Sequence, residues 1–300
     1  SAGVPGTIAG FHHALINYGT LSWKEVLQPS IALAEDGFSI PHDLENILAS
    51  KRYRARLSAD PAASKVFYKE DGSLYKAGET LIQTDLATTL KALSEFGPDA
   101  FYKGDIAKLI VKEMERNGGL ITLEDLARYN VLERPPLIGQ YKDFKIVSMP
   151  PSSSGGTHLI QMLNMLEEFP IKEMGFGTSE SIHILAEVMK RAYADRSKYL
   201  GDSDFYDVPS SLTNKDYAKS LNLNIDLDKI TPSDEVSPGN PYPYESPDTT
   251  HFSAMDAYGN TVSNTYTLNF SYGSGKMIPG TGMLINNEMD DFSSKPGTPN

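Results

Sequence analysis

The sequence contains no cysteine among its 300 residues. This absence excludes disulfide bonds, zinc sites built from thiolates and a cysteine nucleophile. It does not indicate a compartment, because chains without disulfides occur both outside the cell and in the reducing cytosol.

Long apolar runs and an excess of basic charge are also missing. No stretch of about 18 apolar residues is present, so we expect no membrane-spanning helix. The 27 basic and 39 acidic residues give a net charge of −12, and no basic stripe stands out, which argues against nucleic acid as the main partner. The hydrophobic content of 40% predicts a sizeable core, in one large domain or two smaller ones.

The two ends of the sequence have the composition of loops. The first residues, Ser1–Gly6, lack the basic start and apolar centre of a signal peptide. The last residues, Lys295–Asn300, are equally rich in loop-forming types. We therefore expect the chain to be a piece of a longer protein at both ends.

Apolar periodicity predicts helices through most of the first two-thirds of the chain. Ser22 followed by Glu25 forms a capping-box pattern, and Pro29 inside the same helix predicts a kink or a split. Thr122 is expected to cap a short helix. The predicted helices cover residues 7–18, 23–36, 44–57, 85–96, 100–117, 159–169 and 181–199, a strand covers 142–149, and residues 60–78 and 202–248 are predicted loops.

A stretch rich in proline, serine and glycine, residues 150–157, lies between the predicted strand and an apolar helix. Such a loop can bind an anion at the helix N-terminus. It is not a P-loop, because it lacks the lysine and the spacing, and it is not a G-x-S-x-G nucleophile elbow. Its chemistry alone favours a structural loop over a binding site.

Two histidine patterns are candidates for metal sites. His12 and His13 are adjacent, and neighbours on a helix point apart, so they form a poor metal pair. His183 and Glu187 are four residues apart on a predicted helix and are expected to share a face. No third ligand lies nearby in the sequence, so a metal is not expected there either.

A hairpin is predicted near the end of the chain, where residues 250–255 and 261–268 flank a five-residue connection containing glycine and asparagine. The threonine pair Thr249-Thr250 stands at the start of its first strand. If the bond before such a hydroxyl were cut, the new α-amine would lie beside it and could serve as its base. Threonine before a strand is common, so this pattern alone is weak.

Several sequence motifs occur together in this chain. They are G-V-P-G-T-I-A-G-F at 3–11, G-P-D-A-F-Y-K-G at 97–104, N-G-G-L-I-T-L-E-D-L at 117–126, M-P-P-S-S-S-G-G at 149–156, A-Y-A-D-R-S at 192–197, D-T-T-H-F-S at 248–253, Y-T-L-N at 266–269 and N-N-E-M-D-D-F at 286–292. Together, in order and nearly from end to end, these motifs resemble the γ-glutamyltranspeptidase family, and they are most similar to its bacterial members.

The resemblance implies an α+β fold, the αββα sandwich of the N-terminal nucleophile hydrolases, incomplete in this chain. It also implies that the precursor cuts itself between Asp248 and Thr249. Residues 1–248 would then be the C-terminal part of a large subunit, with a linker at about 202–248, and residues 249–300 the start of a small one. Thr249 would be the nucleophile, and Thr267 matches the family threonine whose hydroxyl bonds to it.

The substrate-binding residues implied by the resemblance are Asn269, Glu288 and Asp291. In the family these positions hold the α-amino and α-carboxyl ends of the γ-glutamyl group. Position 288 is glutamine in some relatives and glutamate here, so its contact differs in charge. Acidic side chains suit this task, because a zwitterionic head needs acceptors for its ammonium group.

The resemblance further implies γ-glutamyl transfer and hydrolysis on glutathione or similar amides, with water, an amino acid or a peptide as acceptor. It implies a heterodimer of two subunits from one precursor, no cofactor or metal, and a periplasmic or secreted location. The family's arginine clamp, its oxyanion glycines and its lid loop have no counterpart in these residues. We therefore expect the 300-residue chain alone to be nearly inactive and its Asp248–Thr249 bond to be largely uncut.

Two kinds of alternative stay open. Poly-γ-glutamate depolymerases and cephalosporin acylases share the fold, but their substrates lack a free α-amine or α-carboxyl at the acyl site. Retention of Asn269 and Asp291 favours the small zwitterionic donor. The alternative of another class is a non-catalytic helical binding module.

Overall fold

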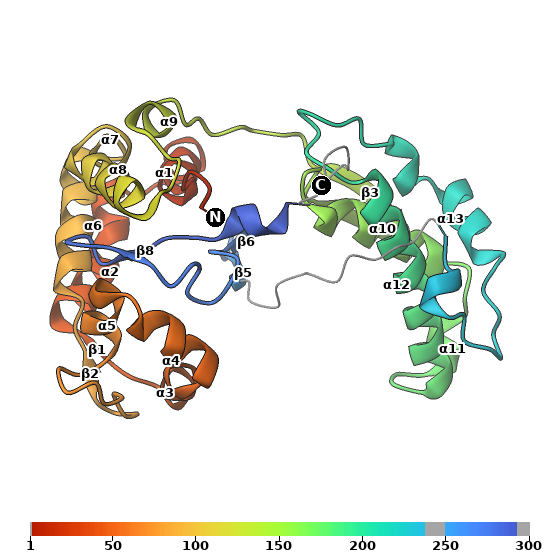
Figure 1. Ribbon diagram of the computed structural model, residues 1–300. Helices are drawn as coiled ribbons and strands as arrows, with labels where there is room; N and C mark the ends of the chain where they lie inside the picture. The colour runs from red at the N-terminus through yellow and green to blue at the C-terminus, as the bar shows by residue number, and fades with distance from the viewer. Residues whose placement is uncertain (1, 238–249, 293–300) are drawn as a thin grey trace. The chain divides into compact units, whose positions relative to one another are not determined.

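The computed structural model describes residues 2–237 and 250–292. The chain divides into two compact units, which are described separately (Figure 1). The first takes in residues 1–132 and 245–290, and the second residues 133–244 and 291–300. Helices predominate, and each sheet among the described residues is a two-stranded antiparallel pair. This mixture of helices and small sheets belongs to the α+β class that was predicted.

The helices of the first unit begin at the local signals that the sequence carries. Ser22 caps α2, since its hydroxyl accepts the Glu25 N–H at 3.3 Å while the Glu25 carboxylate accepts the Ser22 N–H at 2.8 Å. α2 continues through Pro29 without a break. Thr122 caps α9 in the same way. The helices are α1 (Thr7–Tyr18), α2 (Trp23–Asp36), α3 (His42–Ala49), α4 (Lys51–Ser58), α5 (Pro61–Phe67), α6 (Thr84–Phe96), α7 (Asp99–Tyr102), α8 (Asp105–Asn117) and α9 (Leu123–Ala127).

Two predicted helices of this unit are each broken into two. The prediction of one helix over 44–57 is wrong, because Ser50 has extended backbone angles (φ −60°, ψ 137°) and its hydroxyl caps α4 by accepting the Tyr53 N–H. The prediction of one helix over 100–117 is also wrong, since α7 ends before Gly104 and α8 begins after it. In the second case the apolar periodicity continues across Gly104, so the period alone did not reveal that break.

The predicted loop over 60–78 contains a helix. Asp60 caps α5 by accepting the Ala63 N–H at 2.9 Å, and Pro61 occupies the first helical position. Proline suits that position because its missing N–H would have no partner there. Both signals are present in the sequence, but the many charged residues and glycines that follow them led to the prediction of a loop.

The core of the first unit has two clusters of buried residues. The α6–α9 cluster includes Leu93, Phe101, Tyr102, Ile106, Ala107, Ile110, Met114, Ile121, Leu126, Ile278 and Ile285. The α3–α5 cluster includes Ile40, Leu48, Leu57, Ala63, Phe67, Tyr68, Leu81, Tyr272 and Met277. A small strand pair, β1 (Phe38–Ser39) with β2 (Thr80–Leu81), lies beside the second cluster.

A segment from the end of the sequence joins these two clusters. Met277 and Ile278 are the two residues of β7 (Met277–Ile278), which pairs with β8 (Met283–Leu284). Successive strand side chains point to opposite faces, so Met277 enters the α3–α5 cluster and Ile278 the α6–α9 cluster. Figure 1 shows this blue segment running among the helices of the first unit. Residues 272–285 are therefore held by both helical cores.

The predicted hairpin is confirmed as β5 (Thr250–Met255) paired with β6 (Thr261–Tyr266). The Asp256 carboxylate accepts the backbone N–H groups of Tyr258 and Asn260, both at 2.9 Å, which closes the five-residue turn. Residues 251–263 are exposed on both faces of this ribbon.

Where the structure describes it, the second unit carries one hairpin and three longer helices. The predicted strand over 142–149 is β4 (Phe144–Ser148), and its partner β3 (Leu137–Tyr141) was not predicted. The other elements are α10 (Ser154–Leu166), α11 (Ile171–Met174), α12 (Ser179–Tyr199), η1 (Ser210–Thr213), α13 (Lys215–Asn222) and η2 (Ser233–Glu235). α10 thus begins five residues before the predicted start at 159, and α13 lies in the predicted loop over 202–248, so both predictions need this correction.

A buried polar chain connects α10, α12 and α13. His158 bonds to Gln161 at 2.8 Å, Gln161 donates to the Asp195 carboxylate at 2.5 Å, and Tyr217 donates to the same carboxylate oxygen at 2.8 Å. Asp195 is fully buried, and burial raises the pKa of its carboxyl group above the usual range. Around this chain, Met165, Ile184, Val188 and Ala218 form the apolar core of the unit.

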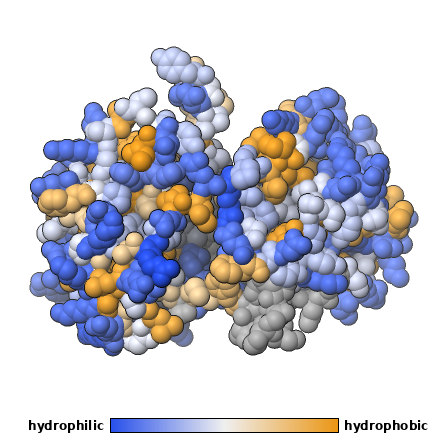
Figure 2. Space-filling view, turned by 90° about the horizontal axis from the view of Figure 1, so that it is seen from above, coloured by the Kyte–Doolittle hydropathy of each residue, from blue (hydrophilic) through white to orange (hydrophobic). Residues whose placement is uncertain are grey.

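In the described ranges, none of the helices combines the length and the apolar character needed to cross a membrane. Figure 2 shows apolar residues in separate groups among hydrophilic ones on the face in view.

Candidate functional site

The two residues of the predicted cleavage junction, Asp248 and Thr249, lie outside the described residues. Thr250 is the first residue of β5, and its backbone pairs with Tyr266 at the end of β6. Thr267 follows directly after that strand. The predicted site residues that the structure does describe are Thr267, Asn269, Glu288 and Asp291.

Thr267 and Asn269 form a tight turn immediately after β6. The Thr267 hydroxyl accepts the Asn269 N–H at 2.9 Å. Asn269 has a φ of +73°, a left-handed conformation that asparagine tolerates better than most residues. Its side chain is only 3% exposed and donates to the Asn287 carbonyl oxygen at 3.1 Å. The turn thus directs Asn269 inward, against the segment that carries the acidic residues.

Asn287 joins this turn to the acidic segment. Its backbone N–H donates to the Leu268 carbonyl at 3.1 Å, and its side-chain oxygen accepts the Phe270 N–H at 3.3 Å. Its side-chain amide donates to the Asp290 carboxylate at 3.1 Å. With the bond from Asn269, one buried residue therefore holds residues 268–270 and the following acidic turn together.

Asn286 performs a similar task toward the start of the chain. Its side-chain oxygen accepts the Gly3 N–H and its amide donates to the Gly3 carbonyl, both at 2.9 Å. The same oxygen accepts the Glu288 N–H at 3.1 Å. The first residues of the chain and the beginning of the acidic turn are thus tied to one amide side chain.

The acidic turn is the short 3₁₀ helix η3 (Glu288–Asp291). Glu288 is half-buried and Asp291 is exposed. Side chains three residues apart eclipse one another in a 3₁₀ helix, so Glu288 and Asp291 share one side of the turn. Glu288 follows directly after Asn287, which binds the Asn269 turn, and a carboxylate is an acceptor suited to an ammonium group.

The loop at 150–157 has a packing role. Ser153 caps α10 by accepting the Gly155 N–H at 3.2 Å. Gly156 is buried in the first turn of α10, where a Cβ atom would lie 1.8 Å from the Met149 carbonyl oxygen. Only glycine allows this approach of helix and strand, which favours the structural interpretation of the loop.

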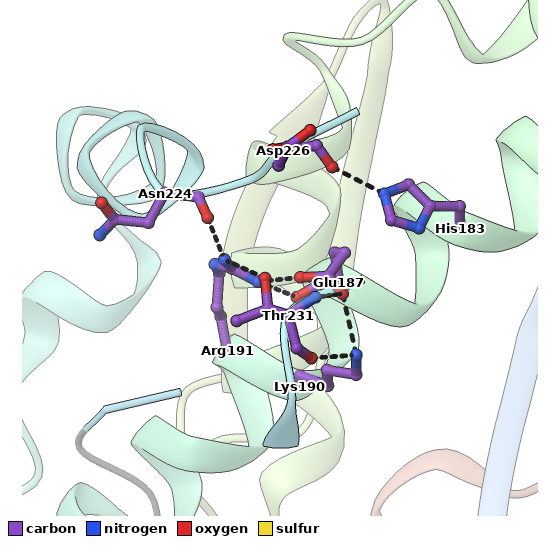
Figure 3. A network of polar contacts seen from close by, with 7 residues as sticks. All are labelled: His183, Glu187, Lys190, Arg191, Asn224, Asp226 and Thr231. Carbon is purple, nitrogen blue, oxygen red and sulfur yellow. Dashed lines mark hydrogen bonds and ion pairs between the residues drawn. The ribbon is translucent and has the colours of Figure 1, made fainter. Parts of the chain in front are cut away.

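His183 and Glu187, which were predicted to share a helix face, both lie on α12. Figure 3 shows the hydrogen bonds and ion pairs that they make. The Glu187 carboxylate is fully buried and accepts bonds from Lys190 at 2.8 Å, Arg191 at 2.7 Å and the Thr231 N–H at 3.0 Å. The His183 ring donates a separate hydrogen bond, to the Asp226 carbonyl oxygen at 2.8 Å.

The electrostatics of Glu187 follow from these partners. Burial by itself would raise the pKa of Glu187, but the hydrogen bonds from Lys190, Thr231 and Arg191 outweigh it and lower the pKa to about 2. Within residues 2–237 and 250–292, no three histidine, aspartate or glutamate side chains are grouped as metal ligands. The network anchors the segment 224–231 to α12, since Arg191 also donates to the Asn224 carbonyl at 2.5 Å.

Sequence reasoning missed the two asparagines that organise the site. Asn286 and Asn287 stood within the quoted N-N-E-M-D-D-F motif, but no role was predicted for them. Their signal was chemical, because two consecutive amides before an acidic cluster can satisfy many backbone groups at once.

Comparison with known proteins agrees with the resemblance found in the sequence. The family model described as gamma-glutamyltranspeptidase matches residues 1–300. A glutathione hydrolase proenzyme of Escherichia coli (strain K12) is 50% identical over 301 residues, which are 100% of this chain and 52% of that protein. The chain thus spans about half the length of the curated relatives it matches.

Solved structures lead to the same family and fold. The crystal structure of Helicobacter pylori gamma-glutamyltranspeptidase is 45% identical, with a TM-score of 0.75 over 82% of this chain and 70% of that one. A cephalosporin acylase from Bacillus halodurans is 26% identical, with a TM-score of 0.85 over 99% of this chain and 54% of that one. The fold is the α+β fold of these N-terminal nucleophile hydrolases, and the chain belongs to the gamma-glutamyltranspeptidase family.

Proposed function

We propose that the protein containing this chain transfers and hydrolyses γ-glutamyl groups, with glutathione or a similar γ-glutamyl amide as donor. The observation that carries the proposal is the arrangement around Asn287. It joins the Thr267–Asn269 turn to the acidic turn Glu288–Asp291, directly after a hairpin that opens at Thr250. The family membership and the 50% identity to a glutathione hydrolase proenzyme support the same activity.

The proposed nucleophile is Thr249, freed by cleavage of the bond after Asp248. Its hydroxyl oxygen attacks the γ-carbonyl carbon of the donor, and its own α-amine, through a water molecule, takes the hydroxyl proton. The amine of the donor leaves with a proton, and a γ-glutamyl ester remains on Thr249. Water or an acceptor amine then attacks the ester, which returns the hydroxyl and releases glutamate or a new γ-glutamyl amide.

Thr267 is proposed to support the nucleophile through its hydroxyl. Thr250 pairs with Tyr266, and the next positions outward along the two strands are 249 and 267. The proposal requires the pairing to extend by this one step. A neighbouring hydroxyl in hydrogen-bond range would orient the Thr249 oxygen and strengthen it as a nucleophile.

Asn269, Glu288 and Asp291 are proposed to bind the head of the γ-glutamyl group. The two carboxylates are acceptors for its ammonium group, and the Asn269 amide is a donor for its carboxylate. One of the two N–H groups of that amide donates to the Asn287 carbonyl, and the other is the proposed donor to the substrate carboxylate.

The proposed subunit organisation follows from the same cleavage. Residues 1–248 belong to the large subunit and residues 249–300 begin the small one, which together form a heterodimer. The proposed cleavage point does not coincide with the division into two compact units, because the first unit contains residues from both sides of that point. A periplasmic or secreted location is proposed by family resemblance alone.

A second candidate is an acylase. The cephalosporin acylase neighbour aligns over 99% of this chain. Such an enzyme would accept an acyl group without an α-amine, for which the acidic turn Glu288–Asp291 offers no partner. A poly-γ-glutamate depolymerase of the same fold differs likewise at the acyl site.

The test uses the full-length precursor and γ-glutamyl-p-nitroanilide. The wild type should appear as two fragments on a denaturing gel and release nitroaniline. Thr249→Ala should remain one uncut chain without turnover, while Thr261→Ala, an exposed threonine of β6, should cut and turn over normally. An uncut, inactive wild type would support a binding module instead, and faster turnover of glutaryl-p-nitroanilide would support the acylase.

A further inference from the structure

Helix α4 packs directly against the segment that carries Asn269. The Arg56 guanidinium donates to the Gly273 carbonyl at 3.0 Å. The Tyr53 hydroxyl bonds to the Ser271 hydroxyl at 2.9 Å, and its ring meets the ring of Tyr272 edge-on at 5.4 Å. The contacts therefore extend over residues 271–273 and come from a helix more than 200 positions earlier in the chain.

Phe270 lies against two arginines of the same helix. The Arg52 guanidinium lies 4.7 Å from the centre of its ring, and the Arg56 guanidinium lies 5.2 Å from the same centre. Arg52 and Arg56 are four residues apart on α4, so both reach the same ring from one face of the helix. Cations held over an aromatic ring stabilise its position.

The position of Phe270 is coupled to that of Asn269. The two residues are adjacent, and the Phe270 N–H donates to the Asn287 side chain while the Asn269 side chain donates to the Asn287 backbone. Asn269 also has a left-handed backbone, which neighbouring contacts must hold in place. A shift of Phe270 would therefore rotate the peptide group that joins it to Asn269.

The absence of a side chain at Gly275 provides the space that Arg56 occupies. At Gly275, which has a φ of +73°, a Cβ atom would lie 2.2 Å from Cγ of Arg56. The aliphatic part of Arg56 thus crosses Gly275 to bring its guanidinium to Gly273 and Phe270. Lysine has the length to cross but lacks the planar, forked donor group, so it can replace only part of this arrangement.

We infer that Arg56 is a positioning residue for the γ-glutamyl site, acting through Gly273 and Phe270 on Asn269. This inference rests on the proposed function. Arg56 touches no proposed reacting atom, so its loss should weaken binding of the donor's head group while leaving the acyl-transfer step largely intact. Self-cleavage, which needs no donor, should also be preserved.

The test compares Arg56→Met, Arg56→Lys and Arg54→Met in the full-length precursor. Arg54 is the matched control, because it lies on the same helix but donates to Gly72 at 3.4 Å. For γ-glutamyl-p-nitroanilide, Arg56→Met should raise KM about tenfold, as expected for loss of one hydrogen bond from a charged donor. Its kcat should change less than about threefold, Arg56→Lys should recover part of KM, and Arg54→Met should match wild type.

Thermal unfolding and self-cleavage separate positioning from general damage. The inference holds if Arg56→Met cuts itself and unfolds near the wild-type temperature but has the raised KM. It is overturned if KM stays at the wild-type value in a folded variant, or if kcat falls as much as KM rises.

A second variant covers the case in which Arg56→Met fails to fold. Phe270→Leu removes the ring that both guanidinium groups contact and keeps an apolar side chain, so it should raise KM in the same way. An unchanged KM in Phe270→Leu would refute the inference. A wild-type precursor that does not turn over the anilide would refute the proposed function, and the inference with it.

Discussion

Replacing Glu187 with glutamine should be among the most destabilising conservative changes in the second unit. The Glu187 carboxylate is fully buried and accepts hydrogen bonds from Lys190, Arg191 and the backbone of Thr231 (Figure 3). Arg191 is itself only 4% exposed. Glutamine removes the negative charge but not the two positive ones, and an unpaired buried charge is strongly unfavourable.

The size of the effect follows from the lowered pKa of Glu187. A folded pKa of about 2 against about 4.3 in an unfolded chain gives about 3 kcal/mol of stability at neutral pH. Because the folded pKa is the lower one, this stability is complete above the unfolded pKa and is lost as the pH falls through the folded pKa. About half of it should remain at pH 3.

Denaturant unfolding of the full-length protein and of Glu187→Gln, at pH 7 and pH 3, measures this contribution. The matched control is Glu124→Gln, which breaks an ion pair of the same spacing to Arg128, with both side chains more than three-quarters exposed. That change should cost about 0.5 kcal/mol or less. A loss at Glu187 as small as at Glu124, or a loss that does not shrink from pH 7 to pH 3, would refute the reasoning.

Three further changes test local features. Asp195→Asn should become more favourable relative to wild type as the pH rises from 4 to 7, because burial raises the pKa of Asp195 and its ionised form is the costly one; a pH-independent difference in melting temperature would contradict this. Gly156→Ala should destabilise by about 2 kcal/mol or more because its Cβ would meet the Met149 carbonyl, whereas Gly155→Ala should be nearly neutral in the same melting experiment. Ser22→Ala should cost about 1 kcal/mol in denaturant unfolding through loss of the α2 cap, and no change would show that the cap is dispensable.

Helix ends were predictable wherever a short-range signal was unambiguous. The caps at Ser22 and Thr122 form within four residues, so the sequence contains all of their partners. The hairpin turn was predictable for the same reason, since Asp256 closes it with its own neighbours up to Asn260.

The break at Ser50 was not predictable from the local sequence. Ser50 could occupy a helix interior or an N-cap, and its polar side chain is compatible with both. The extended backbone is favoured because α3 and α4 both bury apolar residues in one cluster, Leu48 from α3 and Leu57 from α4. A straight helix of that length would turn one of these faces away from the core.

The sequence by itself determined the chemistry available at the proposed site: a hydroxyl at Thr267, an amide at Asn269 and carboxylates at Glu288 and Asp291. Residue types are given directly by the sequence, and a family resemblance is matched position by position. Neither therefore needs coordinates. Only the tertiary structure decided how these groups are held, through Asn287 between the two turns and Arg56 from a helix more than 200 positions away. Those contacts depend on packing between distant segments, which periodicity and composition do not encode residue by residue.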